Sequence, residues 1–260
     1  MTQVALVTGA ARGIGAATVL ALVARGWCVV AVDRCEDDPA VPYPLGTREE
    51  LDAVVREAGA RAAAVTADVR DPSALSVVVA EAEERWGGLD AAVAAAGVIA
   101  GGAPAWEVPV HAEQAVLEVD LGGVLALARV AVPAMLRRPA PRRGRFLAVS
   151  SAADARGLPM LAAYCAAKAG VSGFVRALAV ELAEHGITAN AVSPGSTATA
   201  MLGATAELYG LASPETFAAQ QPLRRLVDPA EVADALAYLA EESSGAITGA
   251  VVRVDGGLAL

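Results

Sequence analysis

The chain of 260 residues is 55% hydrophobic and 4% aromatic, which allows one large α/β domain with a substantial buried core. Its formal net charge of -9 argues against a nucleic-acid partner, and three cysteines without a CxxC pair argue against a disulfide framework or a metal site. Because no basic leader precedes the first apolar run and no run is long enough to cross a bilayer, we expect a soluble, cytoplasmic protein.

Strand-like apolar runs alternate with helix-length segments along the whole chain. This alternation predicts βαβ units with right-handed crossovers, and therefore a three-layer α/β fold with a seven-stranded parallel sheet and helices on both faces. Neither a repeat nor a linker interrupts residues 1–260, which we expect to form a single domain. The expected strands are Val4–Thr8, Cys28–Asp33, Ala62–Thr66, Leu89–Ala94, Arg145–Ser150, Thr188–Val192 and Val251–Val254.

Several residues mark where the intervening helices begin and end. Asp71 and Asp228 each precede a proline, as an N-cap precedes a proline at the first helical position. Glu231 lies three residues after Asp228, as in a capping box. Gly26 and Gly186 follow predicted helices at the position where a left-handed residue commonly ends a helix.

A glycine-rich turn, Thr8–Gly15, follows the first strand and opens a helix. The first turn of a helix carries unpaired N–H groups and the positive end of the helix dipole, so it attracts anions. Gly9, Gly13 and Gly15 allow the backbone to turn tightly and to approach a pyrophosphate. Such a sequence alone can be only a turn, but its position after the first strand predicts a dinucleotide site.

Acidic residues end the second and third predicted strands. Asp33 can accept hydrogen bonds from the adenosine ribose and would repel a 2′-phosphate, which favours NAD over NADP. Arg12 in the turn and Arg34 beside Asp33 favour NADP instead, because either cation can bind a phosphate. The Asp68 carboxylate and the Val69 N–H can serve the adenine ring. A surface charge for Asp33 and a loop cap for Asp68 are the alternative interpretations.

Tyr164 and Lys168 are four residues apart at the start of a predicted helix, so both side chains lie on one face. A phenol titrates at about 10 and is a poor base at neutral pH. Two unit charges about 4 Å apart interact by roughly 4 kcal/mol at an effective dielectric of about 20, which corresponds to roughly three pKa units. Lys168 together with a cationic nicotinamide would therefore bring Tyr164 near neutrality, where acid/base catalysis works best. The alternative is a surface pair on an amphipathic helix.

Ser151 lies at the end of the fifth predicted strand, thirteen residues before Tyr164. Parallel α/β sheets bind ligands at the carboxyl ends of their strands, so the Ser151 hydroxyl can hold a substrate oxygen beside the phenol. Ser150 is the competing candidate for this role. The order of glycine turn, serine, tyrosine and lysine predicts an oxidoreductase that transfers a hydride to or from a nicotinamide.

With these motifs the chain resembles the classical short-chain dehydrogenases/reductases over essentially its whole length. The resemblance implies a seven-stranded Rossmann fold, usually assembled as a homotetramer, in which Tyr164 exchanges the hydroxyl proton, Lys168 also binds the nicotinamide ribose and Ser151 orients the substrate. The implied reaction interconverts a secondary alcohol and a ketone with NAD. The implied cofactor-binding residues are Gly9, Arg12, Gly13, Ile14, Gly15, Asp33, Arg34, Asp68, Val69, Ala95, Ala96, Gly97, Tyr164, Lys168, Pro194, Gly195, Thr197 and Thr199.

Two positions depart from the family pattern. The family has Asn-Asn-Ala-Gly after the fourth strand, whereas this chain has Ala94–Gly97 and so lacks side-chain hydrogen bonds that brace the sheet. The asparagine that completes the family's proton-relay tetrad is replaced by Asp120. In the family that residue holds a water largely through its backbone carbonyl, so Asp120 is kept as a fourth catalytic candidate.

The stretch from Asp33 to Asp68 spans 35 residues, which is longer than is usual in the family. The additional residues, 34–48, resemble the insertion of the mycofactocin-associated branch, including its Tyr43-Pro44-Leu45 portion. The resemblance implies a lid that folds over a tightly held NAD, which an external redox peptide reoxidises. The alternatives are a variable surface loop with freely exchanging NAD(P), and a non-catalytic dinucleotide sensor, which would not need Tyr164 and Lys168.

The segment 196–223 lies between the expected nicotinamide residues and the last helix. Its apolar residues are expected to cover a small hydrophobic alcohol or ketone as a flexible loop. A further alternative for the function of the chain is an epimerase or a dehydratase, but most of those enzymes have longer chains with a separate substrate domain. The residues expected to line the substrate cleft are Trp106, Leu158, Met160, Met201, Leu202, Leu208, Tyr209, Leu211 and Phe217.

Overall fold

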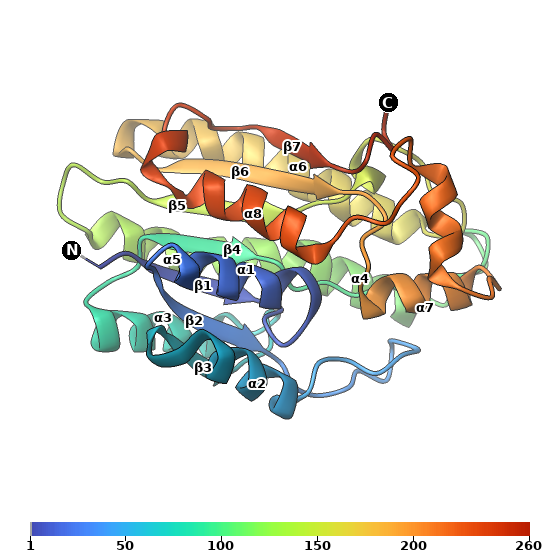
Figure 1. Ribbon diagram of the computed structural model, residues 1–260, viewed down its shortest axis with the longest axis horizontal. Helices are drawn as coiled ribbons and strands as arrows, with labels where there is room; N and C mark the ends of the chain where they lie inside the picture. The colour runs from blue at the N-terminus through green and yellow to red at the C-terminus, as the bar shows by residue number, and fades with distance from the viewer. Residues whose placement is uncertain (1) are drawn as a thin grey trace.

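Seven parallel strands form the centre of the structure, a computed structural model that describes residues 2–260. Their order in the sheet is β3-β2-β1-β4-β5-β6-β7, so the order reverses between β1 and β4. Every neighbouring pair is parallel, which confirms the expected three-layer Rossmann fold (Figure 1). The strands are β1 (Val4–Thr8), β2 (Cys28–Asp33), β3 (Ala62–Thr66), β4 (Ala91–Ala94), β5 (Arg145–Val149), β6 (Thr188–Pro194) and β7 (Val251–Val254).

Helices cover both faces of the sheet because the strands are apolar on both faces. One face packs against α1 (Gly13–Ala24), α2 (Arg48–Ala58) and α8 (Pro229–Ala240), whose apolar side chains join the strands in one core cluster. The other face packs against α3 (Pro72–Trp86), α5 (Gly123–Arg137) and α6 (Ala162–Leu182) in a second cluster. Among these helices, α1 and α8 lie side by side on the near face in Figure 1.

Two shorter helices lie beyond this framework. Helix α4 (Val110–Leu117) runs into one turn of π-helix, Glu118–Gly122, and then into α5. Such turns are frequent at functional sites, because the extra residue redirects a side chain. The segment 196–223, expected as a flexible loop, instead contains α7 (Ala200–Leu208) and a 3₁₀ helix, Pro214–Gln220.

The expected helix signals are present, whereas some strand ends differ from their predicted positions. Asp71 accepts hydrogen bonds from the first turn of α3, and Asp228 forms a capping box with Glu231 at the start of α8. Gly26 and Gly186 have φ values of 90° and 72°, as expected where helices end. The fourth strand begins later than predicted, the fifth ends one residue earlier, and the sixth extends to Pro194.

The carboxyl ends of the strands meet at one edge, where the reversal between β1 and β4 leaves a crevice in sheets of this kind. The long loop between β2 and α2 and the helix α7 both lie at this end of the molecule (Figure 1). None of the helices within residues 2–260 is long and apolar enough to span a bilayer.

Candidate active site

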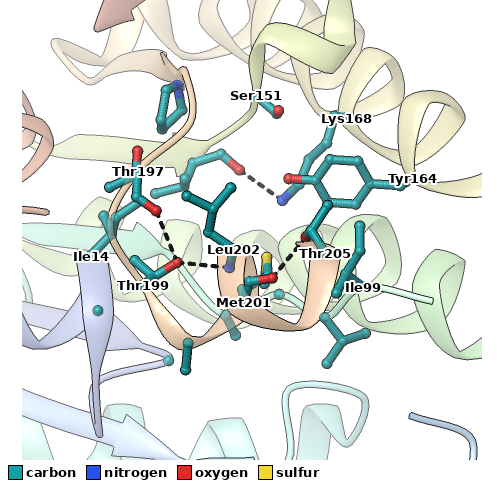
Figure 2. Close-up of a pocket in the computed structure, with 18 of the residues that line it drawn as sticks. Ile14, Ile99, Ser151, Tyr164, Lys168, Thr197, Thr199, Met201, Leu202 and Thr205 are labelled. Carbon is teal, nitrogen blue, oxygen red and sulfur yellow. Dashed lines mark hydrogen bonds between the residues drawn. The ribbon is translucent and has the colours of Figure 1, made fainter. Parts of the chain in front are cut away.

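A cavity of about 630 Å³ opens at the carboxyl ends of the strands. All but one of the residues predicted to bind cofactor or to act in catalysis line it, and Figure 2 shows Ser151, Tyr164 and Lys168 gathered on one side of it. The exception is Asp120, which is fully buried behind the ammonium of Lys168. The structure therefore brings together residues that are up to 190 positions apart in the chain, from Gly9 to Thr199.

The glycine turn forms the part of the wall before α1. A Cβ on Gly15 would lie 2.0 Å from the carbonyl oxygen of Gly9, and Gly9 itself has a φ of 67° and no room for a Cβ against Ala96. The N-cap residue Arg12 makes no side-chain cap, so its side chain does not satisfy the first N–H groups of α1. This cradle with its uncapped helix start fits the pyrophosphate of a dinucleotide such as NAD.

The acidic residues at the strand ends are held by hydrogen bonds. Asp33 accepts from the backbone N–H of Ala11 at 3.0 Å and of Cys35 at 3.3 Å, which fixes its carboxylate beside the turn. Asp68 instead forms an ion pair with Arg70 at 2.6 Å. Burial alone would raise the pKa of Asp68, but the hydrogen bonds and charge of Arg70 lower it below its ordinary value. The sequence analysis did not single out Arg70, although it lies only two residues after Asp68.

Thr8 braces the loop after β4, where this chain lacks the asparagines of the family. Its Oγ1 accepts hydrogen bonds from the N–H groups of Ala95 at 3.1 Å and Ala96 at 3.2 Å. The β1 hydroxyl thus fixes the backbone that the family braces with side chains of this loop.

Tyr164 lies in the first turn of α6, with its ring partly exposed to the cavity. Burial raises the pKa of this phenol, the charge of Lys168 opposes the increase, and the carboxylate of Asp120 reinforces it. A hydrogen bond with Ser151 also lowers the pKa of Tyr164. Lys168 alone therefore does not lower the pKa of this phenol below its ordinary value.

Lys168 is the centre of the buried charge cluster. Its Nζ donates to the carbonyl oxygen of Val149 at 3.1 Å and lies 3.1 Å from Oδ2 of Asp120. The other oxygen of Asp120 accepts from the N–H of Val98 at 2.8 Å. Burial would lower the pKa of Lys168, but Asp120 and Tyr164 raise it, so the lysine stays charged. The π-helical turn thus delivers a carboxylate to the lysine and not to the cavity.

The two candidate serines directly follow β5, and their hydroxyl groups have different partners. The Ser150 hydroxyl is buried and bonded to the carbonyl of Lys168 and to the hydroxyl of Ser172. The Ser151 hydroxyl accepts from the N–H of Ala153 at 3.2 Å and reaches Tyr164. Ser150 therefore ties β5 to α6, whereas Ser151 is placed beside the phenol.

The cavity wall continues from the last residue of β6 into the following loop, with Pro194, Gly195, Thr197 and Thr199. Oγ1 of Thr199 accepts from the N–H of Leu202 as the N-cap of α7 and donates to the carbonyl of Thr197 (Figure 2). These residues hold α7 against the part of the cavity that lies between the glycine turn and Tyr164.

The insertion 34–48 contributes five residues to the lining of the cavity: Arg34, Asp38, Tyr43, Leu45 and Gly46. Tyr43 accepts a hydrogen bond from the N–H of Ile99 at 3.1 Å, and burial raises the pKa of its phenol. Its ring packs in the same apolar clusters as Tyr164. The carbonyl oxygen of Pro44 accepts from Arg12 at 2.6 Å. The insertion therefore contacts both the glycine turn and the surroundings of Tyr164.

The end of the cavity beyond Tyr164 is mainly apolar. Its walls include Leu158, Met201, Tyr209 and Phe217, whereas Leu208 only packs behind them. Besides Leu208, two other expected wall residues do not line the cavity: Trp106 is 83% exposed, and Met160 has a φ of 62° in a tight loop. A sequence pattern does not distinguish an apolar side chain in a pocket from one on the surface.

A protein-family model described as enoyl-(acyl carrier protein) reductase matches residues 9–259. The chain belongs to this family, the short-chain dehydrogenases/reductases. It is 40% identical to a cis-4-hydroxycyclohexanecarboxylate dehydrogenase of Sinomonas cyclohexanicum, over 98% of this chain and 96% of the relative. It is 35% identical to a (-)-trans-carveol dehydrogenase of Rhodococcus erythropolis, over 99% and 98%.

Solved structures of dehydrogenases and reductases are also similar to this chain over nearly its whole length. A carveol dehydrogenase from Mycobacterium avium in complex with NAD has a TM-score of 0.91 and 30% identity, covering 98% of this chain and 97% of its own. An actinorhodin polyketide ketoreductase with NADPH has a TM-score of 0.89 and 35% identity, covering 99% and 97%. The relatives confirm the expected enzyme class, an NAD-dependent alcohol dehydrogenase, and the expected coenzyme, NAD.

Proposed function

We propose that this dehydrogenase oxidises small hydrophobic secondary alcohols to ketones, with Ser151, Tyr164 and Lys168 as its catalytic residues and Asp120 acting through Lys168. The observation that carries the proposal is the meeting of this triad with the glycine turn in one cavity. A non-catalytic dinucleotide sensor would need the turn, but it would not need a phenol, a hydroxyl and an ammonium at the other end.

The chemistry is divided between the coenzyme and the side chains. Bound beside these side chains, NAD would supply the acceptor for the hydride of the carbinol carbon. Tyr164 accepts the hydroxyl proton of the alcohol, and Ser151 holds the same oxygen by a hydrogen bond. In the reverse direction Tyr164 returns the proton to the ketone oxygen. Lys168 stabilises the phenolate form of Tyr164 by its charge, which the low-dielectric surroundings strengthen.

The substrate is proposed to be a cyclic secondary alcohol. Two relatives named above act on such compounds, and the end of the cavity beyond Tyr164 is walled by Leu158, Met201, Tyr209 and Phe217. An apolar wall gains binding energy from a hydrocarbon ring without fixing its orientation by hydrogen bonds. The reacting oxygen is then oriented by Ser151 and Tyr164.

We further propose that the insertion 34–48 is a lid that retains NAD through turnover, and that mycofactocin accepts the reducing equivalents. Supporting this are the hydrogen bonds of Tyr43 with Ile99 and of Arg12 with Pro44, which join the insertion to two residues of the cavity wall. With a retained coenzyme, reoxidation needs an external acceptor. The rival proposal is the same reaction with freely exchanging NAD.

One experiment separates these proposals. Protein purified without added coenzyme is denatured and the released nucleotide is quantified by mass spectrometry. The intact protein is then assayed with a panel of cyclic alcohols, once with free NAD and once with an artificial electron acceptor. We expect close to one NAD per chain and turnover only with the acceptor. An empty protein that turns over with free NAD contradicts retention and leaves the dehydrogenase intact, whereas no turnover in either assay contradicts the proposed activity.

The remaining proposals concern the state of the protein in the cell. We propose a cytoplasmic homotetramer, as the family resemblance implies. Sedimentation equilibrium of the purified protein tests the assembly, and a mass close to that of one 26.1 kDa chain would contradict it.

A further inference from the structure

Three arginines line the end of the cavity formed by the glycine turn and the ends of β2 and β3, which we call the nucleotide end, although NAD carries no 2′-phosphate on its adenosine ribose. Arg12 lies in the glycine turn, Arg34 follows Asp33 directly, and Arg70 follows the end of β3. Guanidinium groups in such positions are the usual partners of a 2′-phosphate, because their forked donors match phosphate oxygens. A relative of this chain has been solved with NADPH, so the fold itself accepts either coenzyme.

Two of these cations share one buried carboxylate. Asp38 is 8% exposed, and its Oδ2 lies 2.7 Å from Arg34 and 2.9 Å from Arg70. Asp68 completes the cluster at 2.6 Å from Arg70 and 3.5 Å from Arg34. The two guanidinium groups and these two carboxylates balance in formal charge, while the exposed Glu36 lies 3.9 Å from Arg34 at the rim of the cluster.

The carboxylate of Asp38 is built into the insertion. Its Oδ1 accepts from the N–H of Ala40 at 2.9 Å, which fixes the side chain within its own loop. Burial alone would raise its pKa, but this hydrogen bond and the guanidinium groups of Arg34 and Arg70 lower it. Asp38 therefore stays charged at neutral pH.

The insertion also engages the third cation. Arg12 donates to the carbonyl oxygen of Pro44 at 2.6 Å. All three arginines that could attract a 2′-phosphate are thus bonded to residues of the insertion, Asp38 or Pro44.

From this arrangement we propose that Asp38 is a specificity-determining residue that excludes NADP by neutralising and restraining Arg34 and Arg70. The inference rests on the proposed NAD-dependent activity and assigns the insertion a second task besides retention. Asp33 repels a 2′-phosphate directly, whereas Asp38 removes the attraction that its cationic neighbours would exert. Without the charge of Asp38, Asp68 is shared by two guanidinium groups, and their freed donors become available for a phosphate.

Asp38→Asn tests the proposal, because asparagine keeps an oxygen for the N–H of Ala40 while the charge is lost. Glu36→Gln is the matched control, since it removes the same charge from the same loop at an exposed side chain whose carboxylate lies 3.9 Å from Arg34. A double variant, Asp38→Asn with Arg34→Met, removes the released cation as well. Circular dichroism melts verify that each variant is folded.

Two readouts are independent of turnover. The first is the ratio of NADP(H) to NAD(H) extracted from each purified protein. The second is the affinity of the nucleotide-free fraction for NADPH and for NADH, followed by the fluorescence of the reduced nicotinamide. We expect Asp38→Asn to raise both the extracted ratio and the relative NADPH affinity at least tenfold, Glu36→Gln to change neither, and the double variant to lose most of the gain.

An unchanged ratio in a folded Asp38→Asn protein overturns the inference. Equal weakening of both coenzymes also overturns it, because the cluster then serves only to close the insertion. Neither result bears on the dehydrogenase activity, which fails only if the wild-type protein oxidises no alcohol of the panel.

Discussion

The two ends of the cavity are stabilised by different kinds of contact between their residues. At the nucleotide end, charged groups form a network: Asp38 contacts Arg34 and Arg70 at 2.7 Å and 2.9 Å, and Arg12 donates to a backbone carbonyl. At the end beyond Tyr164, which we call the alcohol end, the segment 196–223 packs through apolar side chains. The rings of Tyr209 and Phe217, for example, meet edge to face at 6.1 Å.

This difference separates two kinds of recognition. Directional and charged contacts discriminate sharply between ligands, because an unmatched polar group is costly to bury. Apolar contacts discriminate weakly, by about 1–3 kcal/mol for one methylene group. We therefore expect a strict choice of coenzyme and a tolerant choice of alcohol, and each prediction below can contradict or refine that contrast.

The largest effect is expected where the two ends meet. Tyr164→Phe removes the group that we propose to exchange the alcohol proton, and we expect the rate of alcohol oxidation to decrease by a factor of about 10²–10⁴. Bound NAD should remain, since the nucleotide end is unchanged. Tyr238→Phe is the control, because Tyr238 is 47% exposed on α8. A Tyr164→Phe protein with wild-type turnover of every alcohol would favour the sensor interpretation.

The second effect concerns the nucleotide end alone. Gly15→Ala places a methyl group where a Cβ meets the carbonyl of Gly9 at 2.0 Å, so the turn must open. We expect a loss of retained NAD and a decrease of about 1–3 kcal/mol in the free energy of unfolding. Gly173→Ala is the control, because a Cβ there meets nothing within 4 Å and α6 gains up to about 1 kcal/mol of helix propensity. Retained NAD in Gly15→Ala would show that the turn does not constrain the dinucleotide.

The third effect concerns the alcohol end. Met201→Ala shortens a wall of the apolar part of the cavity, and we expect kcat/KM for a cyclic alcohol to decrease about tenfold, with NAD retention unchanged. Leu223→Ala is the control, since Leu223 belongs to the same segment but is 61% exposed. A change in coenzyme retention in Met201→Ala would mean that the two ends are not separable.

The same contrast explains what the sequence allowed us to predict. The strands, the glycine turn and the Tyr164–Lys168 pair depend on short-range spacing, so the pattern of the chain was sufficient to place them. The pairing of Asp38 with Arg70 joins residues 32 positions apart and depends on how the insertion folds back. The exposure of Trp106 likewise depends on loop geometry that no periodicity records.

Asp120 illustrates the limit most clearly. Its position was predicted from the family pattern, which placed an asparagine there in a proton relay, but its contact was not. The π-helical turn directs the carboxylate toward Lys168 at 3.1 Å, away from the cavity. The carboxylate at this position offsets part of the effect that the positive charge of Lys168 has on the pKa of Tyr164.

The smallest effect, a shift in pH dependence, follows from that contact. Burial and the charge of Asp120 both raise the pKa of Tyr164, while Lys168 lowers it. Asp120→Asn keeps an acceptor for the N–H of Val98 but removes the charge, so the pKa of Tyr164 should decrease. Alcohol oxidation requires the deprotonated phenol, and its rate therefore rises with pH through this pKa. We expect that rise to move to lower pH by about one unit, with little change in the maximal rate.

The control for this shift is Glu118→Gln, which removes an equal charge from an exposed residue of the same π-helical turn. The pH profile of single-turnover alcohol oxidation with the retained coenzyme is the measurement, because it reports the enzyme–substrate complex without product release. A purely structural role for Asp120 would lower stability and leave the profile in place. A shift to higher pH would contradict the assigned direction, because it would mean that the carboxylate stabilises the phenolate and does not oppose it.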